Sequence, residues 1–154
     1  MEHKLNVLCR IAEQLNSRGI TWAVGASGML YLNGIADSFH DLDIMVEVAH
    51  IAEAKAALDT MGTLQERIPN PNFKTEHFLE YVIEDVEADV IAGFIITKDG
   101  TDHHLPFDAA HIERIVTVNG QQIPLQSRSD WQHYYMLLDR PNKAQMCKEN
   151  PEFK

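Results

Sequence analysis

Cysteine is scarce in this sequence, and long apolar runs are missing altogether. Cys9 and Cys147, the two cysteines among 154 residues, stand near opposite ends without a CxxC-type pattern. We therefore expect two reduced thiols rather than a disulfide. No apolar run approaches the roughly 18 residues that a bilayer requires, and Met1–Lys4 lacks the basic start of a secretory signal. We expect a cytoplasmic protein without a membrane anchor.

Basic residues are also few. The chain has 13 Lys and Arg against 23 Asp and Glu, a formal net charge of −10 at pH 7. Since a surface that follows a phosphate backbone needs many cations, this balance disfavours extended nucleic acid as a partner. A nucleoside triphosphate (NTP) remains compatible with it, because bound metal ions offset the charge of such a ligand. An acidic cleft would in addition attract a cationic acceptor.

The remaining composition is that of one globular domain. Hydrophobic residues make up 45% and charged residues 23% of the chain, without a repeat, linker or low-complexity tract. Residues 1–154 are therefore expected to form a single domain with a short helical tail from about residue 127. Helical spacing and capping residues predict helices at 3–17, 29–32, 51–61, 127–138 and 139–146. Alternation and β-branched runs predict strands at 20–24, 41–48, 78–83, 86–96, 115–118 and 121–125. Together they indicate an α+β fold, a small mixed β-sheet with helices packed on it.

Short patterns predict how these elements connect. Asn119-Gly120 is a strong hairpin signal, and Pro124 in the following strand suggests an edge position. Pro69–Asn72 is expected to be an exposed loop. The last long helix carries an apolar stripe that is more typical of a core than of a base-stacking platform. Its members are Trp131, Tyr134, Tyr135 and Leu138.

Two aspartates on the 41–48 strand give the first chemical signal. Asp41 and Asp43 are two residues apart, so they point to the same face and lie about 6–7 Å apart along the strand. Neighbouring anions among buried aliphatic residues are unfavourable unless solvent or a cation compensates. Carboxylate oxygens are ligands that suit Mg²⁺ or Mn²⁺. An isolated D-x-D is more often a solvated strand end or turn, so the interpretation depends on other segments.

Two such segments accompany the aspartates. Gly25-Ala26-Ser27 ends a strand directly before a helix, where free backbone N–H groups and the Ser27 hydroxyl can hold a phosphate. Downstream, Asp89, with Glu87 close by, brings a third carboxylate into an apolar strand and can complete a metal site. Taken singly, the first segment is a tight turn and the acids are polar face residues. In combination they favour a metal and phosphate site.

These residues resemble the minimal nucleotidyltransferases of the polymerase-β superfamily, which includes aminoglycoside and lincosamide nucleotidyltransferases. That family has a hydrophobic residue before Gly-Gly or Gly-Ser, a spacer, an Asp-hydrophobic-Asp/Glu motif and a third acid on a later strand. Val24-Gly25-Ala26-Ser27, Asp41-Leu42-Asp43-Ile44 and Asp89 look like this series in order. Ser129–Trp131 and Asp139–Lys143 look like the segment after the family's core. The resemblance spans residues 20–145, roughly.

The resemblance implies a nucleotidyltransferase (polymerase-β-like) fold and a metal-dependent reaction. In that reaction a nucleoside monophosphate (NMP) moves from an NTP to a hydroxyl group of a small molecule or protein. Asp41 and Asp43 would each ligate both of two Mg²⁺ (or Mn²⁺) ions that accompany the bound NTP. Asp89 would ligate one ion and act as general base.

The resemblance also implies a nucleotide-binding site. Gly25 and Ser27 would contact the β- and γ-phosphates of ATP or another NTP. Lys143, together with Arg140, would offset the phosphate charge.

The chain departs from the family in ways that leave a second function open. Asp37–His40 stands where many members carry an Arg and a Thr, and Ala26 replaces the second small residue of the usual pair. A long helical C-terminal domain, which shapes the acceptor pocket in antibiotic-modifying members, is not visible. The alternative is a catalytically inactive nucleotidyltransferase-fold module with a binding or regulatory role, as in a toxin–antitoxin-like pair. A homodimer would be one way to supply the acceptor wall.

Other candidates are weaker. His103-His104 beside Asp102 invites a zinc interpretation, but adjacent histidines point apart and no ligand at suitable spacing completes a tetrahedral set, so a loop is expected. His77, with Lys74 close by, is expected to lie in an exposed polar patch. Ser27 lacks the G-x-S-x-G context of a hydrolytic nucleophile.

Overall fold

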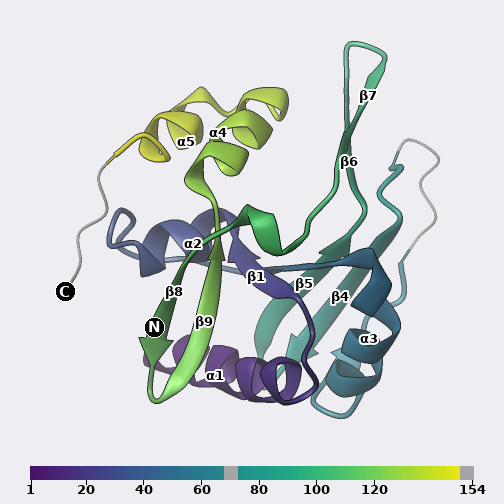
Figure 1. Cartoon of the computed structure of the whole chain (residues 1–154), viewed down its shortest axis with the longest axis vertical. Helices are drawn as coiled ribbons and strands as arrows, with labels where there is room; N and C mark the ends of the chain where they lie inside the picture. The colour runs from purple at the N-terminus through teal and green to yellow at the C-terminus, as the bar shows by residue number, and fades with distance from the viewer. Residues whose placement is uncertain (68–72, 150–154) are drawn as a thin grey trace.

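A seven-stranded mixed sheet forms the centre of the molecule within residues 1–67 and 73–149, the parts that the computed structural model describes (Figure 1). In spatial order its strands are β3 (Thr63–Leu64), β4 (His77–Ile83), β5 (Val86–Ala92), β2 (Leu42–Val46), β1 (Trp22–Gly25), β9 (Gln121–Gln126) and β8 (Ile112–Val118). Strand β2 runs parallel to β5, and β1 runs parallel to β9. The other neighbours are antiparallel. The predicted α+β class is confirmed, although the sheet is larger than the small one expected.

A second pair of strands leaves this sheet. Strands β6 (Phe94–Lys98) and β7 (Thr101–Leu105) form an antiparallel hairpin that projects away from the main sheet (Figure 1). The hairpin is tied to the C-terminal helices, because Lys98 Nζ donates to the backbone oxygen of Met136, 3.3 Å away, and to Asp139. It therefore stands beside the helices rather than extending the sheet.

Helices cover the two faces of the sheet (Figure 1). α1 (Glu2–Ser17) and α3 (Ile51–Asp59) lie on one face, and α4 (Arg128–Leu137) and α5 (Pro141–Met146) lie on the other. α2 (Ala26–Leu32) follows β1 directly, and two short 3-10 helices span Val48–His50 and Ala109–His111. No helix within the described ranges is long and apolar enough to cross a membrane.

Alternation along β2 separates the two faces chemically. Leu42, Ile44 and Val46 are fully buried. The same face holds Trp22 of β1, whose indole N–H donates to Asn16 of α1 over 2.8 Å. Asp43 therefore points to the opposite face, where α4 lies. The face with α1 and α3 is apolar along β2. The other face also contributes to the hydrophobic core, with Met45 and Trp131, but carries Asp43.

Several predicted elements are confirmed, including α1, α3, the Asn119-Gly120 hairpin and the free cysteines, both of which are buried. Others need correction. The 86–96 strand is two strands, because Gly93, with φ of 63°, breaks it. Pro124 does not mark an edge, because β9 lies between β1 and β8. The missing N–H is tolerated there because the β1–β9 ladder is a single pair, Val24 with Leu125.

Smaller corrections concern element ends. The 29–32 helix begins at Ala26, and the 41–48 strand is shorter, Leu42–Val46. Leu138, predicted to belong to an apolar stripe, is 42% exposed because α4 ends one residue before it. His103-His104 lies on β7 rather than in a loop. The predicted Pro69–Asn72 loop lies outside the described residues.

Candidate active site

Two aspartates from different strands stand opposite each other. In the parallel pairing of β2 with β5, Asp43 is the partner of Asp89, and Leu42 is the partner of Ala88. Because alternate residues share a face, Asp41 and Glu87 lie one step further along on the same side as Asp43 and Asp89. The sequence-based expectation that these three aspartates share one face of the sheet is met by this register.

The pairing continues onto the next strand on either side. Glu80 of β4 pairs with Asp89, and Gly25 of β1 pairs with Asp43. We call the five acids of this face the carboxylate face. Its members are Asp41, Asp43, Glu80, Glu87 and Asp89.

The acids of this face repel one another. Burial, followed by the negative charges of Asp89 and Asp41, raises the pKa of Asp43 to about 7. Burial, followed by the charges of Asp41, Glu80 and Glu87, raises the pKa of Asp89 to about 6. Such shifts are expected where carboxylates share one site without a nearby cation. The carboxylate face would therefore be stabilised by a bound positive charge.

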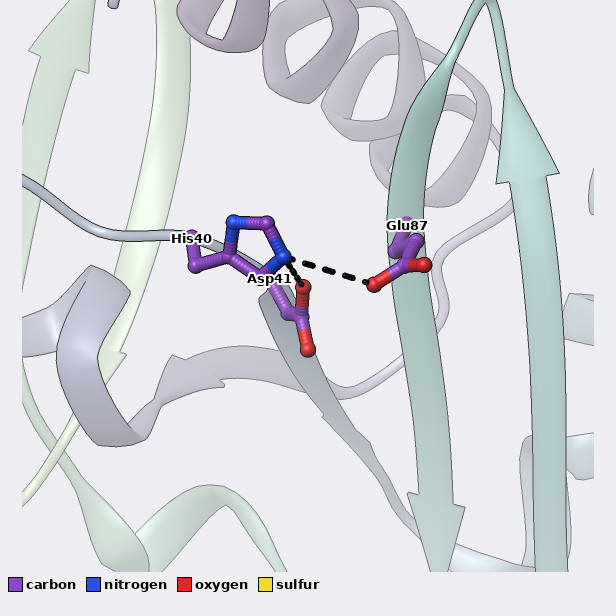
Figure 2. Close-up of side chains that lie close together, drawn as sticks. All are labelled: His40, Asp41 and Glu87. Atoms are coloured by element: carbon purple, nitrogen blue, oxygen red, sulfur yellow. Dashed lines mark ion pairs between the residues drawn. The ribbon is translucent and has the colours of Figure 1, made fainter.

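A histidine lies next to the outer pair of acids (Figure 2). His40 Nε2 is 3.4 Å from Asp41 Oδ1 and 3.8 Å from Glu87 Oε2, and its side chain is 87% exposed. A hydrogen bond and the charge of Asp41 raise the pKa of Glu87. In residues 1–67 and 73–149, these three side chains are the one group whose metal-ligating atoms all lie within 4.8 Å of one another. Asp43 and Asp89 do not belong to this group.

The oxygen atoms of the carboxylate face fit a divalent ion. Asp41 Oδ1 is buried and makes no hydrogen bond within the described ranges, although His40 Nε2 lies 3.4 Å away. A buried acceptor that makes no hydrogen bond is unfavourable, and a cation would satisfy it. Oxygen donors of this kind are typical of Mg²⁺ or Mn²⁺ sites. The compact ligand group of the described residues is His40, Asp41 and Glu87, of which Asp41 alone was predicted as a ligand from the sequence.

The turn beside these acids is shaped by its neighbours. We call Gly25-Ala26-Ser27 the glycine turn; it leads from β1 into α2. Any Cβ atom on Gly25 would lie 2.6 Å from Cζ2 and Nε1 of Trp131. Ala26 has a φ of 51°, a left-handed conformation that is uncommon outside glycine. Glycine at the first position is therefore required by the indole ring that covers it.

The predicted cations lie at the start of α5, where Arg140 directly precedes the helix and Lys143 belongs to it. The pKa of the Tyr135 hydroxyl is raised by burial and by the charges of Cys147 and Asp43, and the charge of Arg140 opposes this shift. Arg140 thus acts electrostatically on the same tyrosine as Asp43. Lys143, half-buried on α5, acts electrostatically on Cys147. Within the described ranges, no ion pair joins Lys143 to the carboxylate face.

Sequence reasoning missed three contributors to this site. Glu80 comes from β4, and its place beside Asp89 depends on a strand pairing that no local pattern reveals. His40 directly precedes the D-x-D motif, but only the fold brings it to Glu87. Trp131 had been assigned to the core, which is correct since it is 3% exposed, yet the same ring also covers Gly25.

A groove lies elsewhere on the molecule. It has a volume of about 670 Å³ and lies between α2 and the edge strand β8, lined by Tyr31, Asp37 and Arg114 among others. None of the carboxylate face lines it. The candidate site is the carboxylate face rather than the groove, because the acids carry the reactive groups and the raised pKa values.

Comparison with known proteins gives the fold a family context. No family model matches the chain, and no curated protein matches it in sequence. A candidate nucleotidyltransferase from Thermotoga maritima has a crystal structure that is similar with a TM-score of 0.75 at 25% identity, over 94% of this chain and 90% of that one.

Two antibiotic-modifying proteins share the architecture at lower identity. ANT(2″)-Ia, in complex with adenylyl-2″-tobramycin, has a TM-score of 0.65 at 10% identity, over 94% of this chain and 87% of its own. The lincosamide antibiotic adenylyltransferase LnuA, lincomycin-bound, has a TM-score of 0.58 at 11% identity, over 89% of this chain and 91% of its own. The sequence resemblance and the structural similarity agree, and the chain has the nucleotidyltransferase fold of the polymerase-β-like superfamily.

Proposed function

We propose that this protein is a metal-dependent nucleotidyltransferase that moves an NMP from an NTP to a hydroxyl group of a small molecule or protein. The observation that carries the proposal is the pairing of Asp43 with Asp89 beside Asp41 and the glycine turn. The fold supports it, because solved structures with this fold include a lincosamide antibiotic adenylyltransferase. The nucleotide and the acceptor are left open by the proposal.

The carboxylate face would hold the metal. Asp41 and Asp43 would each ligate two Mg²⁺ or Mn²⁺ ions, and Asp89 would ligate one of them. Divalent ions at such a site neutralise phosphate charge and make a bound hydroxyl more acidic. The raised pKa values of Asp43 and Asp89 support this assignment, because each carboxylate lacks a cationic partner strong enough to keep its pKa low.

Asp89 would also accept a proton. A general base must lie within reach of the proton that it removes, and Asp89 stands next to Asp43 on the carboxylate face, where the acceptor hydroxyl would meet the metal ions. Its Oδ atoms would take the hydroxyl proton of the acceptor.

The phosphates would lie along the glycine turn. The backbone N–H of Gly25 and the half-buried Ser27 hydroxyl would donate to the β- and γ-phosphate oxygens. Arg140 and Lys143 would offset the remaining charge. Arg140 is exposed and acts on the same tyrosine as Asp43, which supports its place near the phosphates.

A binding experiment tests this proposal. Isothermal titration with ATP, GTP, CTP and UTP, with and without Mg²⁺, is expected to show metal-dependent binding of at least one nucleotide. Asp43→Asn removes a ligand charge without changing side-chain size and should abolish that binding. Asp85→Asn is the matched control, because Asp85 lies in the exposed turn between β4 and β5. Equal binding by both variants, or no binding by the wild type, would contradict the proposal.

A further inference from the structure

A buried glutamine binds the tryptophan of α4 that covers the glycine turn. Gln126, at the end of β9, is 0% exposed. Its amide oxygen accepts from Nε1 of Trp131 over 2.9 Å. Its amide nitrogen donates to Asp130 Oδ2 over 3.1 Å and to the Tyr134 hydroxyl over 3.2 Å. Asp130 Oδ2 also lies 2.7 Å from Nδ1 of His111. Both ends of the buried amide are therefore occupied by fixed partners.

The same edge of the indole that meets the glutamine also meets the turn. The ring atoms nearest to a Cβ on Gly25 are Cζ2 and Nε1, at 2.6 Å, and Cε2, at 2.7 Å. Nε1 is the donor to Gln126. The hydrogen bond to Gln126 thus fixes the orientation of the ring edge that rests on Gly25.

The turn needs support of this kind. Ala26 adopts a φ of 51°, and a left-handed conformation is unfavourable for a non-glycine residue. Such a conformation persists only where its surroundings hold it. Gly25 is fixed on one side by its pairing with Asp43 and on the other by the indole of Trp131. Without the ring, the chain at Ala26 would be free to relax to a lower-energy conformation.

We propose that Gln126 and Trp131 are positioning residues that hold the glycine turn in its phosphate-binding conformation. The contribution of the pair to nucleotide binding rests on the proposed function. Its effect on the turn does not, because that effect concerns the free protein. The two consequences can therefore be tested separately.

The first test observes the turn in the free protein. Gln126→Met keeps the side-chain length but removes both hydrogen-bonding ends, whereas Gln122→Met is the control on the exposed part of the same strand. Nuclear magnetic resonance is expected to show changed amide shifts and faster amide exchange at Gly25, Ala26 and Ser27 in Gln126→Met alone. The Asn119-Gly120 turn should be unchanged. Unaltered amides in the glycine turn would overturn the inference.

The second test measures nucleotide binding. With the nucleotide that the wild type binds most tightly in the presence of Mg²⁺, we expect Gln126→Met to weaken binding about tenfold. Trp131→Phe, which keeps a ring but loses the N–H, should weaken it by a similar factor. Combining both substitutions should add little to either one, because one residue acts through the other. Additive losses would overturn the inference, as would a Gln126→Met variant that binds like the wild type.

Two outcomes separate this inference from the proposed function. If the wild type binds no nucleotide but the amides of the turn respond to Gln126→Met, the proposed function fails and the positioning role stands. If the wild type binds nucleotide and neither test responds to Gln126→Met, the positioning role fails alone. Should Gln126→Met not fold, Trp131→Phe is used in both tests instead, because it removes the N–H that donates to Gln126 and leaves the bonds from Gln126 to Asp130 and Tyr134 in place.

Discussion

Asp43 and Asp89 are direct partners across the parallel strands β2 and β5, and Asp43 is also the partner of Gly25 across β1. One residue therefore connects the acids with the turn that would hold the phosphates. The pKa of Asp43 is raised to about 7, first by burial and then by the charges of Asp89 and Asp41. Closely spaced carboxylates destabilise the free protein, but they suit a protein that binds a cation.

The free protein should lose stability as the pH rises. Asp43 has a folded pKa of about 7, well above its ordinary value of 3.8, so folding favours the protonated carboxyl group. The resulting stabilisation is present below pH 4, roughly, and is lost as the pH rises through about 7. After allowance for solvent screening we expect a loss of about 1–2 kcal/mol, or a fall in Tm of roughly 3–6 °C.

The measurement is thermal unfolding at pH 5 and pH 8 of the wild type and of Asp43→Asn. Other groups also titrate over this range, so the difference between the two proteins is the quantity of interest. The difference between the two proteins should shrink when Mg²⁺ is added at pH 8, because the ion then compensates the negative charge of Asp43. A pH dependence that is identical in both proteins would show that the pKa of Asp43 is not raised in the folded protein.

A methyl group on Gly25 should be poorly tolerated. Gly25 has a φ of −114°, so alanine meets no backbone penalty there, but its Cβ would lie 2.6 Å from the buried indole of Trp131. Overpacking of this kind costs about 1–3 kcal/mol. Gly28→Ala is the matched control, since its Cβ would lie 3.0 Å from a side-chain methyl group of Val24. Chemical denaturation should show the larger loss for Gly25→Ala; equal losses would mean that the indole moves away freely.

Thr75 should stabilise the start of the β6–β7 hairpin. Its hydroxyl accepts from the backbone N–H of Ile95 over 3.1 Å and lies 3.3 Å from the backbone oxygen of the same residue, in a position that is 8% exposed. Thr75→Val keeps the shape and leaves the Ile95 groups without this partner, at a cost of about 1–3 kcal/mol. Thr117→Val, on an exposed position of β8, should change the free energy of unfolding far less. A silent Thr75→Val would indicate that water replaces the hydroxyl.

The two cations at the start of α5 should matter for nucleotide binding rather than for folding. Arg140→Met and Lys143→Met each remove one positive charge from the region that would face the triphosphate. We expect a several-fold weaker NTP affinity, about 1 kcal/mol per charge, with a smaller salt dependence. Arg18→Met, at the exposed end of α1, is the control. If the control weakens binding as much, the effect comes from net charge and not from the site.

The sequence predicted those parts of the site that depend on local periodicity. Alternation along residues 41–48 was enough to place Asp41 and Asp43 on one face. It could not show which strand would lie alongside, and the pairing of Glu80 with Asp89 came only from the fold. The strand predicted at 86–96 failed because β-branched residues continue on both sides of Gly93, whereas the backbone turns there.

The cover of the glycine turn could not be predicted for a related reason. A helical stripe of aromatic residues indicates a buried face and nothing about its partner. The fold brings Trp131 from α4 onto Gly25, and Gln126 fixes the ring in place. Motif spacing is local, whereas the surroundings that orient a motif come from distant segments.

The most direct test of the proposed activity follows the α-phosphorus of the nucleotide. The protein is incubated with Mg²⁺, each of the four NTPs labelled at the α-phosphate and a cell extract as the source of acceptors, and products are identified by mass spectrometry. We predict that a recipient gains the mass of one NMP with release of pyrophosphate, and that Asp43→Asn lowers the rate at least 100-fold, roughly, whereas Asp85→Asn does not. Tight binding of an NTP without transfer of label to any recipient would contradict the account and identify a binding module instead.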